Sequence, residues 1–506
     1  MYTSTRAAAS ALLLAAVSLL APPRAAAQAA PAGEIAEHVR ALATVSAAID
    51  AMGGRSELQR ITAIERRMVG ARSDPGQAGE LGVPDRTPVA QVSARTAGPA
   101  RSAEYLDLRV RGGLRLELRT VTDGRDAFTL IYPNRTVNQI PGARAQPILQ
   151  SALRRHPESL LTAVANRPFS TRWVARRPCG GQISDVVSYA DADGAFMYLC
   201  FDPATHLLSS VARVGDDPVR GDVMVEARYL DYRQFGAVRL PTRYVDVLGS
   251  DTVSDMRVEI RLNDQVPDTL FTRPAGFADA PPAPAQPTLQ PLGGGAYAVL
   301  GGYNSAFVVL DSFVVVLEAP LSSGSSDAVL GFIRQAAPGK PVRYVVATHF
   351  HYDHLGGIRP FVAEGATILT TPTAASVIRR LVRQPHLLRP DALSRAPREP
   401  VIEEVTRART LGQGEQRVEI EPLGRMPHVD EILVVYVPQA KLLFEGDLFD
   451  AYAVDQLPGT DDSVRLVEWI AAHRLAVDHL LPVHGVMSDL AGLRRSVDRR
   501  SETAQR

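Results

Sequence analysis

The sequence predicts an α/β protein in which a mainly antiparallel β domain precedes a domain of sheets covered by helices. In the first half, stretches such as SDMRVEIRL carry an apolar residue at every second position. This pattern is typical of antiparallel strands with one solvated face. In the second half, apolar runs such as AFVVLDSFVVVLEAP alternate with helical patterns, which indicates buried strands covered by helices. We therefore expect a β-rich domain over residues 30–276 and a helix-covered domain over residues 293–506.

Length and charge limit the possible functions. A chain of 506 residues is long enough for two or three domains. Its 55 lysines and arginines balance its 55 aspartates and glutamates, so the protein has no global field that would attract a polyanion. We expect a small-molecule substrate and no nucleic-acid partner.

The first residues have the composition of an export signal. Arg6 precedes an apolar run over residues 7–21, and small residues suited to cleavage follow at 25–29. The alternative is a membrane anchor, which needs about 20 apolar residues, whereas Pro22, Pro23 and Arg24 interrupt this run. Residues 1–29 are expected to be a signal peptide, and no later stretch is long and apolar enough to form a transmembrane segment. The mature protein is then periplasmic or secreted.

The β-rich region begins and is interrupted by helical segments. Residues 33–54 have helical spacing and end at Gly53 and Gly54, a typical C-terminal cap. A second helical segment is expected over residues 146–166. The segment 277–292 is rich in proline and then glycine, a composition that favours extended, unpacked backbone, and we place the linker between the domains there.

The chain contains two cysteines, Cys179 and Cys200. In an oxidising compartment they can form a disulfide that closes a loop of about 20 residues and stabilises the fold by ~3 kcal/mol. The alternative is two separate buried thiols.

The stretch THFHYDHLGG, residues 348–357, follows directly on the apolar strand YVVAT. Side chains two apart on an extended segment point the same way, so His349 and His351 can converge on one point. Asp353 and His354 follow as the chain turns. Imidazole and carboxylate are ligands of zinc, with iron or manganese also compatible. A histidine-rich surface turn is the alternative, but it does not explain four potential ligands in six residues.

The pattern HFHYDH resembles the HxHxDH signature of the metallo-β-lactamase superfamily. Further elements of that family occur in the expected order: His428 before an apolar strand, Asp447 in LLFEGDLFD, and His484 in LLPVHG. The resemblance implies an αββα metallo-β-lactamase sandwich for the C-terminal domain.

The resemblance also implies two zinc ions. His349, His351 and His428 would hold one ion, and Asp353, His354 and His484 the other, with Asp447 bridging them. A hydroxide between the ions would be the nucleophile. Asp353 would have the additional catalytic role of orienting that hydroxide and returning a proton to the leaving group.

Other residues near the motifs have weaker patterns. Glu445 lies two residues before Asp447, but the glycine-aspartate pair favours Asp447 as ligand. His479 is expected to pack near the site, His473 to lie on the surface, and His386 in a polar insert is a candidate for substrate contact. The family's usual aspartate is replaced by Glu318, which we expect to support a ligand from behind.

The N-terminal region is similar in pattern to periplasmic lipoprotein-carrier domains, which implies an apolar or lipid ligand there. Taken together, the sequence predicts an exported zinc-dependent hydrolase of an ester, thioester, lactone or lactam bond. The alternative is a periplasmic binding or carrier protein with an accessory metal domain.

Overall fold

The computed structural model describes residues 32–83, 85–98, 100–109, 115–192, 194–280, 286–449 and 458–504. The expected signal peptide, residues 1–29, lies outside this part of the chain. Within it, no helix combines the length and the apolar character that a membrane crossing requires.

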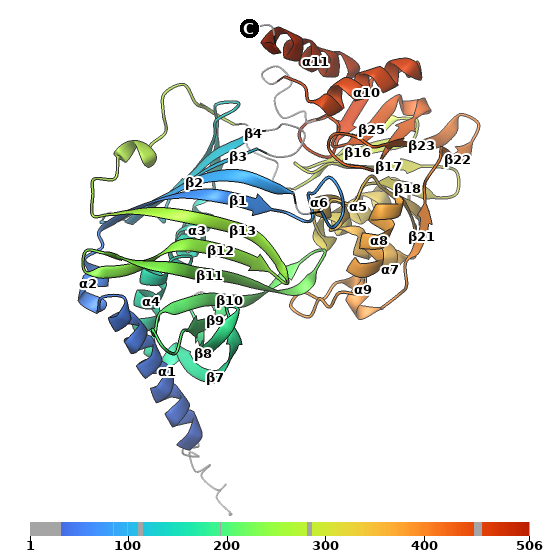
Figure 1. Cartoon of the computed structure of the whole chain (residues 1–506). Helices are drawn as coiled ribbons and strands as arrows, with labels where there is room; N and C mark the ends of the chain where they lie inside the picture. Colours follow the sequence, from blue (N-terminus) through green and yellow to red (C-terminus); the bar gives the residue numbers. More distant parts are fainter. Residues whose placement is uncertain are drawn as a thin grey trace, which may run out of the picture.

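The N-terminal half forms one curved sheet of fourteen strands (Figure 1). All neighbouring strands are antiparallel except the short pair β14 and β6. From one edge to the other, the strands are β14 (Ala278–Asp279), β6 (Thr136–Ile140), β5 (Ala127–Ile131), β4 (Arg115–Thr122), β3 (Ala100–Arg109), β2 (Arg86–Ala97), β1 (Ala63–Ser73), β13 (Asp251–Leu262), β12 (Val238–Leu248), β11 (Gly221–Phe235), β10 (Leu208–Asp217), β9 (Phe196–Phe201), β8 (Gln182–Ala190) and β7 (Thr171–Cys179). The predicted mainly antiparallel β domain is confirmed.

Four helices accompany this sheet: α1 (Ala32–Ala51), α2 (Arg55–Gln59), α3 (Gly142–Arg154) and α4 (Pro157–Ala165). α1 ends before Gly53 and Gly54, which both have positive φ as a helix C-terminus requires. The helical segment expected over residues 146–166 is two helices rather than one. The reason is Pro157, which disfavours helical backbone at the preceding residue; His156 is extended, with φ −121° and ψ 126°.

A buried ion pair fastens α4 to the sheet. Arg66 of β1 donates to Glu158 at 2.6 Å, and both side chains are almost fully buried. Burial opposes the ionised carboxylate, but the charge of Arg66 outweighs it and lowers the pKa of Glu158 to about 2. Apolar residues from α1, α4 and the sheet form the main core of this half, among them Val45, Leu160, Leu199, Phe201 and Val258.

Cys179 and Cys200 form a disulfide, with their Cα atoms 6.0 Å apart. It joins the end of β7 to β9, and both strands pair with β8. The structure therefore selects the disulfide over two separate thiols.

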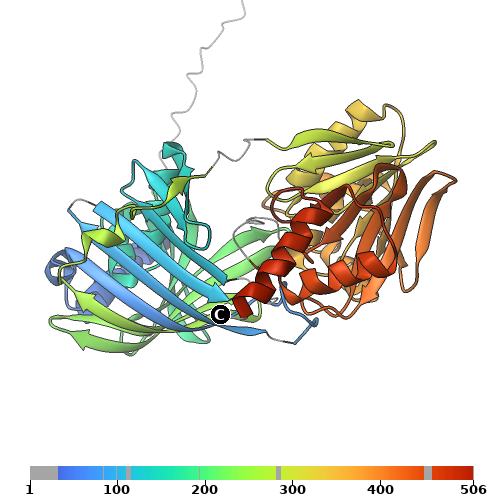
Figure 2. The same ribbon diagram turned by 90° about the horizontal axis from the view of Figure 1, so that it is seen from above.

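The C-terminal half contains two packed sheets with helices outside them (Figure 2). The first sheet has the order β15 (Thr288–Gly293), β16 (Ala296–Leu300), β17 (Ser305–Val309), β18 (Val314–Leu317), β19 (Val342–Ala347), β20 (Thr367–Thr370) and β21 (Val401–Glu404). The second has the order β22 (Arg409–Gln413), β23 (Gln416–Gly424), β24 (Ile432–Val437), β25 (Leu442–Gly446) and β26 (His479–Pro482). The change from the N-terminal sheet to these sheets falls between Asp279 and Thr288.

The helices of this half are α5 (Ser323–Ala336), α6 (Tyr352–Leu355), α7 (Ile358–Glu364), α8 (Pro372–Leu381), α9 (Ala392–Arg395), α10 (Asp461–Ala472) and α11 (Leu490–Ala504). The sequence of β18 is apolar throughout because each face of the strand packs against a different buried cluster. Val315 and Leu317 join the cluster between the two sheets, whereas Val314 and Val316 join the cluster that includes helix residues such as Val329 and Ile333. Both faces of the strand are buried, and the predicted α/β architecture of this half is confirmed.

We predict that Glu158→Ala destabilises the N-terminal sheet by about 3–5 kcal/mol, because it leaves Arg66 buried without its partner. Trp173 lies in β7 and Trp469 in α10, so urea unfolding followed by fluorescence in a Trp469→Phe background reports on the N-terminal half alone. The control is Asp279→Ala, which removes the exposed partner of Arg273 in the same half of the chain and should change stability by less than about 1 kcal/mol. Equal effects of the two substitutions would contradict the role of the buried pair.

Candidate metal centre

The histidine-rich segment lies at the carboxyl end of β19, where the buried strand gives way to α6. His349, His351 and His354 are fully buried, and the ring centroids of His349 and His351 are 4.4 Å apart. The following Gly356 allows α6 to pack closely on the chain behind it, since a Cβ there would lie 2.1 Å from the carbonyl oxygen of Leu321. The turn thus faces three imidazoles into the protein rather than into solvent.

Three distant segments add their side chains to this turn. His428 comes from the loop between β23 and β24, and its backbone N–H donates to Asp462 at 3.1 Å. Asp447 follows β25, and His484 follows β26, where its ring lies 4.7 Å from that of Tyr303. All seven residues predicted as metal ligands therefore meet at one place.

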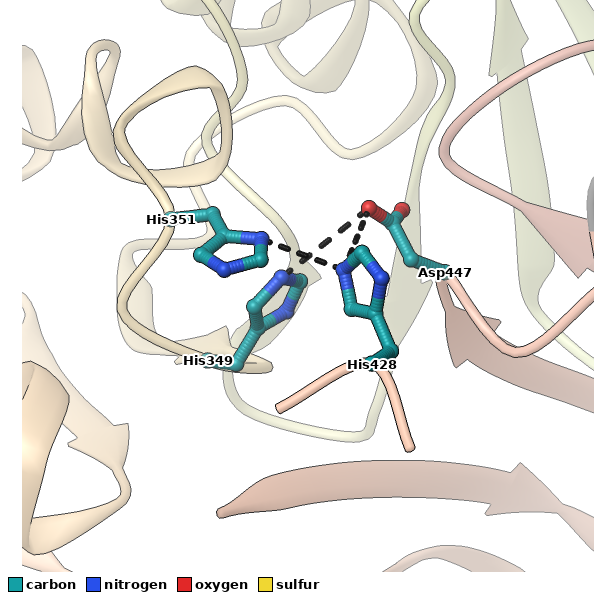
Figure 3. A group of neighbouring side chains, drawn as sticks. All are labelled: His349, His351, His428 and Asp447. Atoms are coloured by element: carbon teal, nitrogen blue, oxygen red, sulfur yellow. Dashed lines mark hydrogen bonds and ion pairs between the residues drawn. The ribbon is translucent and has the colours of Figure 1, made fainter. Parts of the chain in front are cut away.

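The seven side chains form two groups. In each group the ligand atoms lie within 4.8 Å of one another. The first group is His349, His351, His428 and Asp447, shown in Figure 3; the second is Asp353, His354 and His484.

Asp447 lies between the two groups. Its Oδ2 is 3.2 Å from Nε2 of His428, and its Oδ1 is 3.1 Å from Nε2 of His354 and 3.3 Å from Nε2 of His484. One carboxylate oxygen thus faces each group. The preceding Gly446 has φ +70°, and a Cβ there would lie 3.1 Å from Oγ1 of Thr348.

Glu445, the competing acid of this strand, has a different role. Its buried carboxylate accepts the backbone N–H groups of Leu448 at 2.7 Å and Phe449 at 3.0 Å. It therefore shapes the turn that presents Asp447.

Glu318 fixes the orientation of two histidines from behind. Its Oε2 accepts from the hydroxyl of Thr348 at 2.6 Å and lies 3.0 Å from Nδ1 of His354. Since a carboxylate only accepts, His354 donates through Nδ1. Because the Thr348 hydroxyl donates its hydrogen bond to Glu318, it accepts one from Nδ1 of His349 at 3.0 Å. With Nδ1 protonated, each imidazole can offer its Nε2 lone pair to a metal.

His351 is oriented by the N-terminal half of the chain. Its Nε2 donates to the carbonyl oxygen of Ala78 at 2.9 Å, which leaves Nδ1 directed at Nε2 of His428, 3.1 Å away. Gln77 donates its side-chain amide to Oδ1 of Asp353. The loop that follows β1 thus contacts two of the seven residues, and Figure 1 shows this loop beside α6.

Backbone contacts hold this loop in place. Gly76 accepts from Tyr352 N–H and Gly79 accepts from Asp430 N–H, each at 3.0 Å. A Cβ at Gly76 would lie 2.6 Å from the ring of Tyr352. The sequence did not predict that Gln77 and Ala78 contact the site. They lie in a polar loop rich in glycine, and no pattern in it indicates a contact with residues more than 270 positions away.

The electrostatics of the cluster reflect opposite charges that burial brings together. Burial disfavours a charged His484, but Asp447 and Asp353 outweigh it and raise the pKa of His484 to about 10. The pKa of His354 is raised well above its ordinary value for the same reason. Burial also disfavours a charged Asp353, yet His354 and His484 lower its pKa to about 2. The carboxylates are thus ionised at neutral pH, and either protonated histidines or metal ions balance their charge.

The chemistry of these side chains fits a pair of metal ions. Nε2 of His349, Nε2 of His354 and Oδ1 of Asp447 are buried and make no hydrogen bond within the described part of the chain. Buried polar atoms without a hydrogen bond are costly, and these three point into the cluster. Imidazole and carboxylate donors without thiolates suit a catalytic zinc site. The two groups are consistent with a binuclear metal site.

A cavity of about 930 Å³ opens beside the centre. Asp353, His428, Asp447 and His484 form one part of its wall, so a substrate that enters the cavity reaches both groups. Strands of the N-terminal sheet supply much of the remaining wall.

The other candidate residues lie elsewhere. His473 is exposed and contacts the carbonyl oxygen of Trp469. His479 begins β26 beside Leu442, away from the ligand cluster. His386 is buried against Asp216 at 3.2 Å and is not among the residues that line the cavity.

We predict that Gln77→Ala lowers the affinity of the centre for zinc by about 10–100-fold, because Asp353 loses the partner that orients it. Competition with a chromophoric chelator measures this affinity directly. Glu80→Ala changes an exposed residue of the same loop and should leave it unchanged. An unaltered affinity in Gln77→Ala would show that the contact has no effect on the metal site.

Comparison with known proteins agrees with the geometry in the C-terminal part. The model of the metallo-β-lactamase superfamily matches residues 299–465. Matching solved structures include a metallo-β-lactamase from Pontibacter korlensis, with 19% identity over 43% of this chain and 99% of that chain and a TM-score of 0.32. DIM-1 metallo-β-lactamase matches with 19% identity over 44% of this chain and 99% of that chain, also with a TM-score of 0.32. No curated protein sequence matches the chain.

The family match lies outside the N-terminal half, whose resemblance to lipoprotein-carrier domains stays a prediction. For the C-terminal part, the family match accompanies a two-group cluster of histidines and aspartates. Residues 299–465 therefore belong to a metallo-β-lactamase superfamily domain.

Proposed function

We propose that the protein is an exported zinc-dependent hydrolase that cleaves an ester, thioester, lactone or lactam bond of a small molecule. The observation that carries this proposal is the position of Asp447, with one oxygen toward each of two groups of ligands at the wall of a cavity. When bound, two zinc ions would lower the pKa of a water molecule and polarise the carbonyl of the substrate.

The side chains around the ions have separate tasks in this proposal. His349, His351 and His428 hold one ion, Asp353, His354 and His484 hold the other, and Asp447 contacts both. Asp353 faces the cavity and is held between Gln77 and His484. There its carboxylate can orient the attacking water and pass a proton to the leaving group.

The alternative function is a periplasmic binding or carrier protein with an accessory metal domain. An accessory domain has no need of a complete ligand set, whereas all seven ligands are present and converge. The zero net charge argues against a nucleic-acid substrate. The complete ligand set therefore favours the enzyme.

Metal analysis combined with a small substrate panel tests the proposal. Protein exported to the periplasm should contain about two zinc ions per chain, rather than iron or manganese, and should start after residue 29. It should hydrolyse at least one of nitrocefin, a thioester, a lactone and an aryl ester, and chelation should remove that activity. Protein that carries its full zinc complement and hydrolyses none of these compounds would contradict the assignment.

We predict that His351→Ala abolishes turnover, with a loss on the order of 100-fold or more, because the first group loses a ligand. The N-terminal sheet should stay folded, since His351 lies in the C-terminal half and its ring bonds to the loop after β1, at the Ala78 carbonyl, rather than to a strand. Steady-state kinetics and circular dichroism measure the two effects. His473→Ala, an exposed histidine outside the cluster, is the matched control. Full activity in His351→Ala would refute the metal centre.

We predict that zinc binding releases about two protons near neutral pH, because His354 and His484 are protonated in the ion-free protein and must lose those protons to bind metal. Since the pKa of both groups is raised, affinity should rise with pH through the neutral range and fall on acidification. Titration of zinc into metal-free protein with a pH indicator counts the protons. In His484→Ala the release should fall by about one proton, and binding without proton release would contradict the charge state.

A further inference from the structure

We propose that the N-terminal sheet supplies an apolar subsite for the substrate, which binds a hydrocarbon group attached to the bond that the metal centre cleaves. The position of the reacting bond rests on the proposed function. The subsite itself rests on the cavity and on the register of three strands.

The register places four apolar side chains on one face of the sheet. Leu108 of β3 lies opposite Leu116 of β4, and Leu118 of β4 lies opposite Ile131 of β5. Directly paired residues share a face, and so do residues two apart on a strand. All four are half-buried rather than covered, and all four line the cavity. They form a continuous apolar surface, here called the leucine face.

The leucine face belongs to the same cavity as the metal ligands. Other apolar residues of the wall come from both halves of the chain: Val219, Leu248 and Val253 from the N-terminal half, and Leu321 and Phe449 from the C-terminal half. A molecule bound along this wall has its polar end at Asp353, Asp447 and His484. The volume of about 930 Å³ is near the upper end of the range for small-molecule sites, which leaves room for a long group.

The charged residues of the wall do not favour a polyanionic substrate. Arg115 donates to Asp107 at 2.9 Å from both Nε and Nη2, and Arg220 pairs with Asp217 at 3.4 Å while its guanidinium lies over the ring of Tyr352. Four aspartates of the N-terminal half, Asp74, Asp85, Asp107 and Asp217, lie at or beside the wall. An uncharged alkyl or aryl group therefore fits the leucine face better than a phosphate does.

Chain-length dependence of hydrolysis tests the subsite. With p-nitrophenyl esters of two, four, six and eight acyl carbons, kcat/KM should rise with each methylene by up to about fourfold, the factor expected for burial of one CH₂. The double variant Leu116→Asn and Leu118→Asn should lower kcat/KM for the octanoyl ester at least tenfold. It should leave the acetyl ester within about twofold, because the short acyl group does not reach the leucine face. Circular dichroism verifies that the variant is folded.

A binding measurement separates the subsite from catalysis. In metal-free His351→Ala protein, fluorescence titration with 11-(dansylamino)undecanoic acid should show binding that octanol displaces and that the two asparagines weaken at least tenfold. The control Ile183→Asn changes an exposed apolar residue on β8, outside the cavity, and should leave both measurements unchanged.

The outcomes distinguish the two proposals. Hydrolysis that is independent of acyl length, or equal losses for both esters in the double variant, would overturn the subsite and leave the hydrolase standing. Probe binding that depends on Leu116 and Leu118 in a zinc-loaded protein that hydrolyses none of nitrocefin, the thioester, the lactone and the aryl esters would support the subsite and overturn the hydrolase. Probe binding that is unaffected by the two asparagines would also overturn the subsite.

Discussion

The arrangement of the candidate metal centre depends on the contacts of the Asp447 carboxylate. This carboxylate lies between two groups of imidazoles that come from three separate segments, and its two oxygens face different groups. Burial of this charge is unfavourable unless cations surround it. The neighbouring His354 and His484 hold the pKa of Asp447 well below its ordinary value, and metal ions would provide the same compensation more strongly. The cluster is therefore a strongly polar site within an apolar core, and hydrogen bonds from neighbouring residues orient its side chains.

That orientation depends on residues that touch no metal. Glu318 and Thr348 determine which nitrogen of His354 and His349 carries the proton, and the carbonyl of Ala78 does so for His351. The sequence predicts that Glu318 supports a ligand from behind, and its carboxylate contacts His354. Glu318 makes these contacts from a backbone with φ +73°, an uncommon conformation for a residue with a side chain. Such strain is tolerated where the surroundings determine the conformation.

The contacts of the loop after β1 make the two halves of the chain one functional unit. Four consecutive residues, 76–79, bond to the segments that carry His351, Asp353 and His428. The cavity has walls from both halves. The N-terminal sheet is thus part of the site rather than a separate platform, and its leucine face gives it a direct part in substrate binding under the proposed function.

The sequence by itself identified the seven residues that the structure brings together and the type of each domain. The type of each domain follows from strand periodicity and buried apolar runs, which depend on local spacing. The seven residues follow a pattern in which HFHYDH, His428, Asp447 and His484 occur in a fixed order. The sequence left open whether Cys179 and Cys200 form a disulfide or remain two separate thiols. Only the tertiary structure decided that pairing and the buried contact of Arg66 with Glu158. Above all, it decided that Gln77 and Ala78 reach the metal centre. These contacts join residues that are far apart in the chain. They leave no periodicity in the sequence from which they could be predicted.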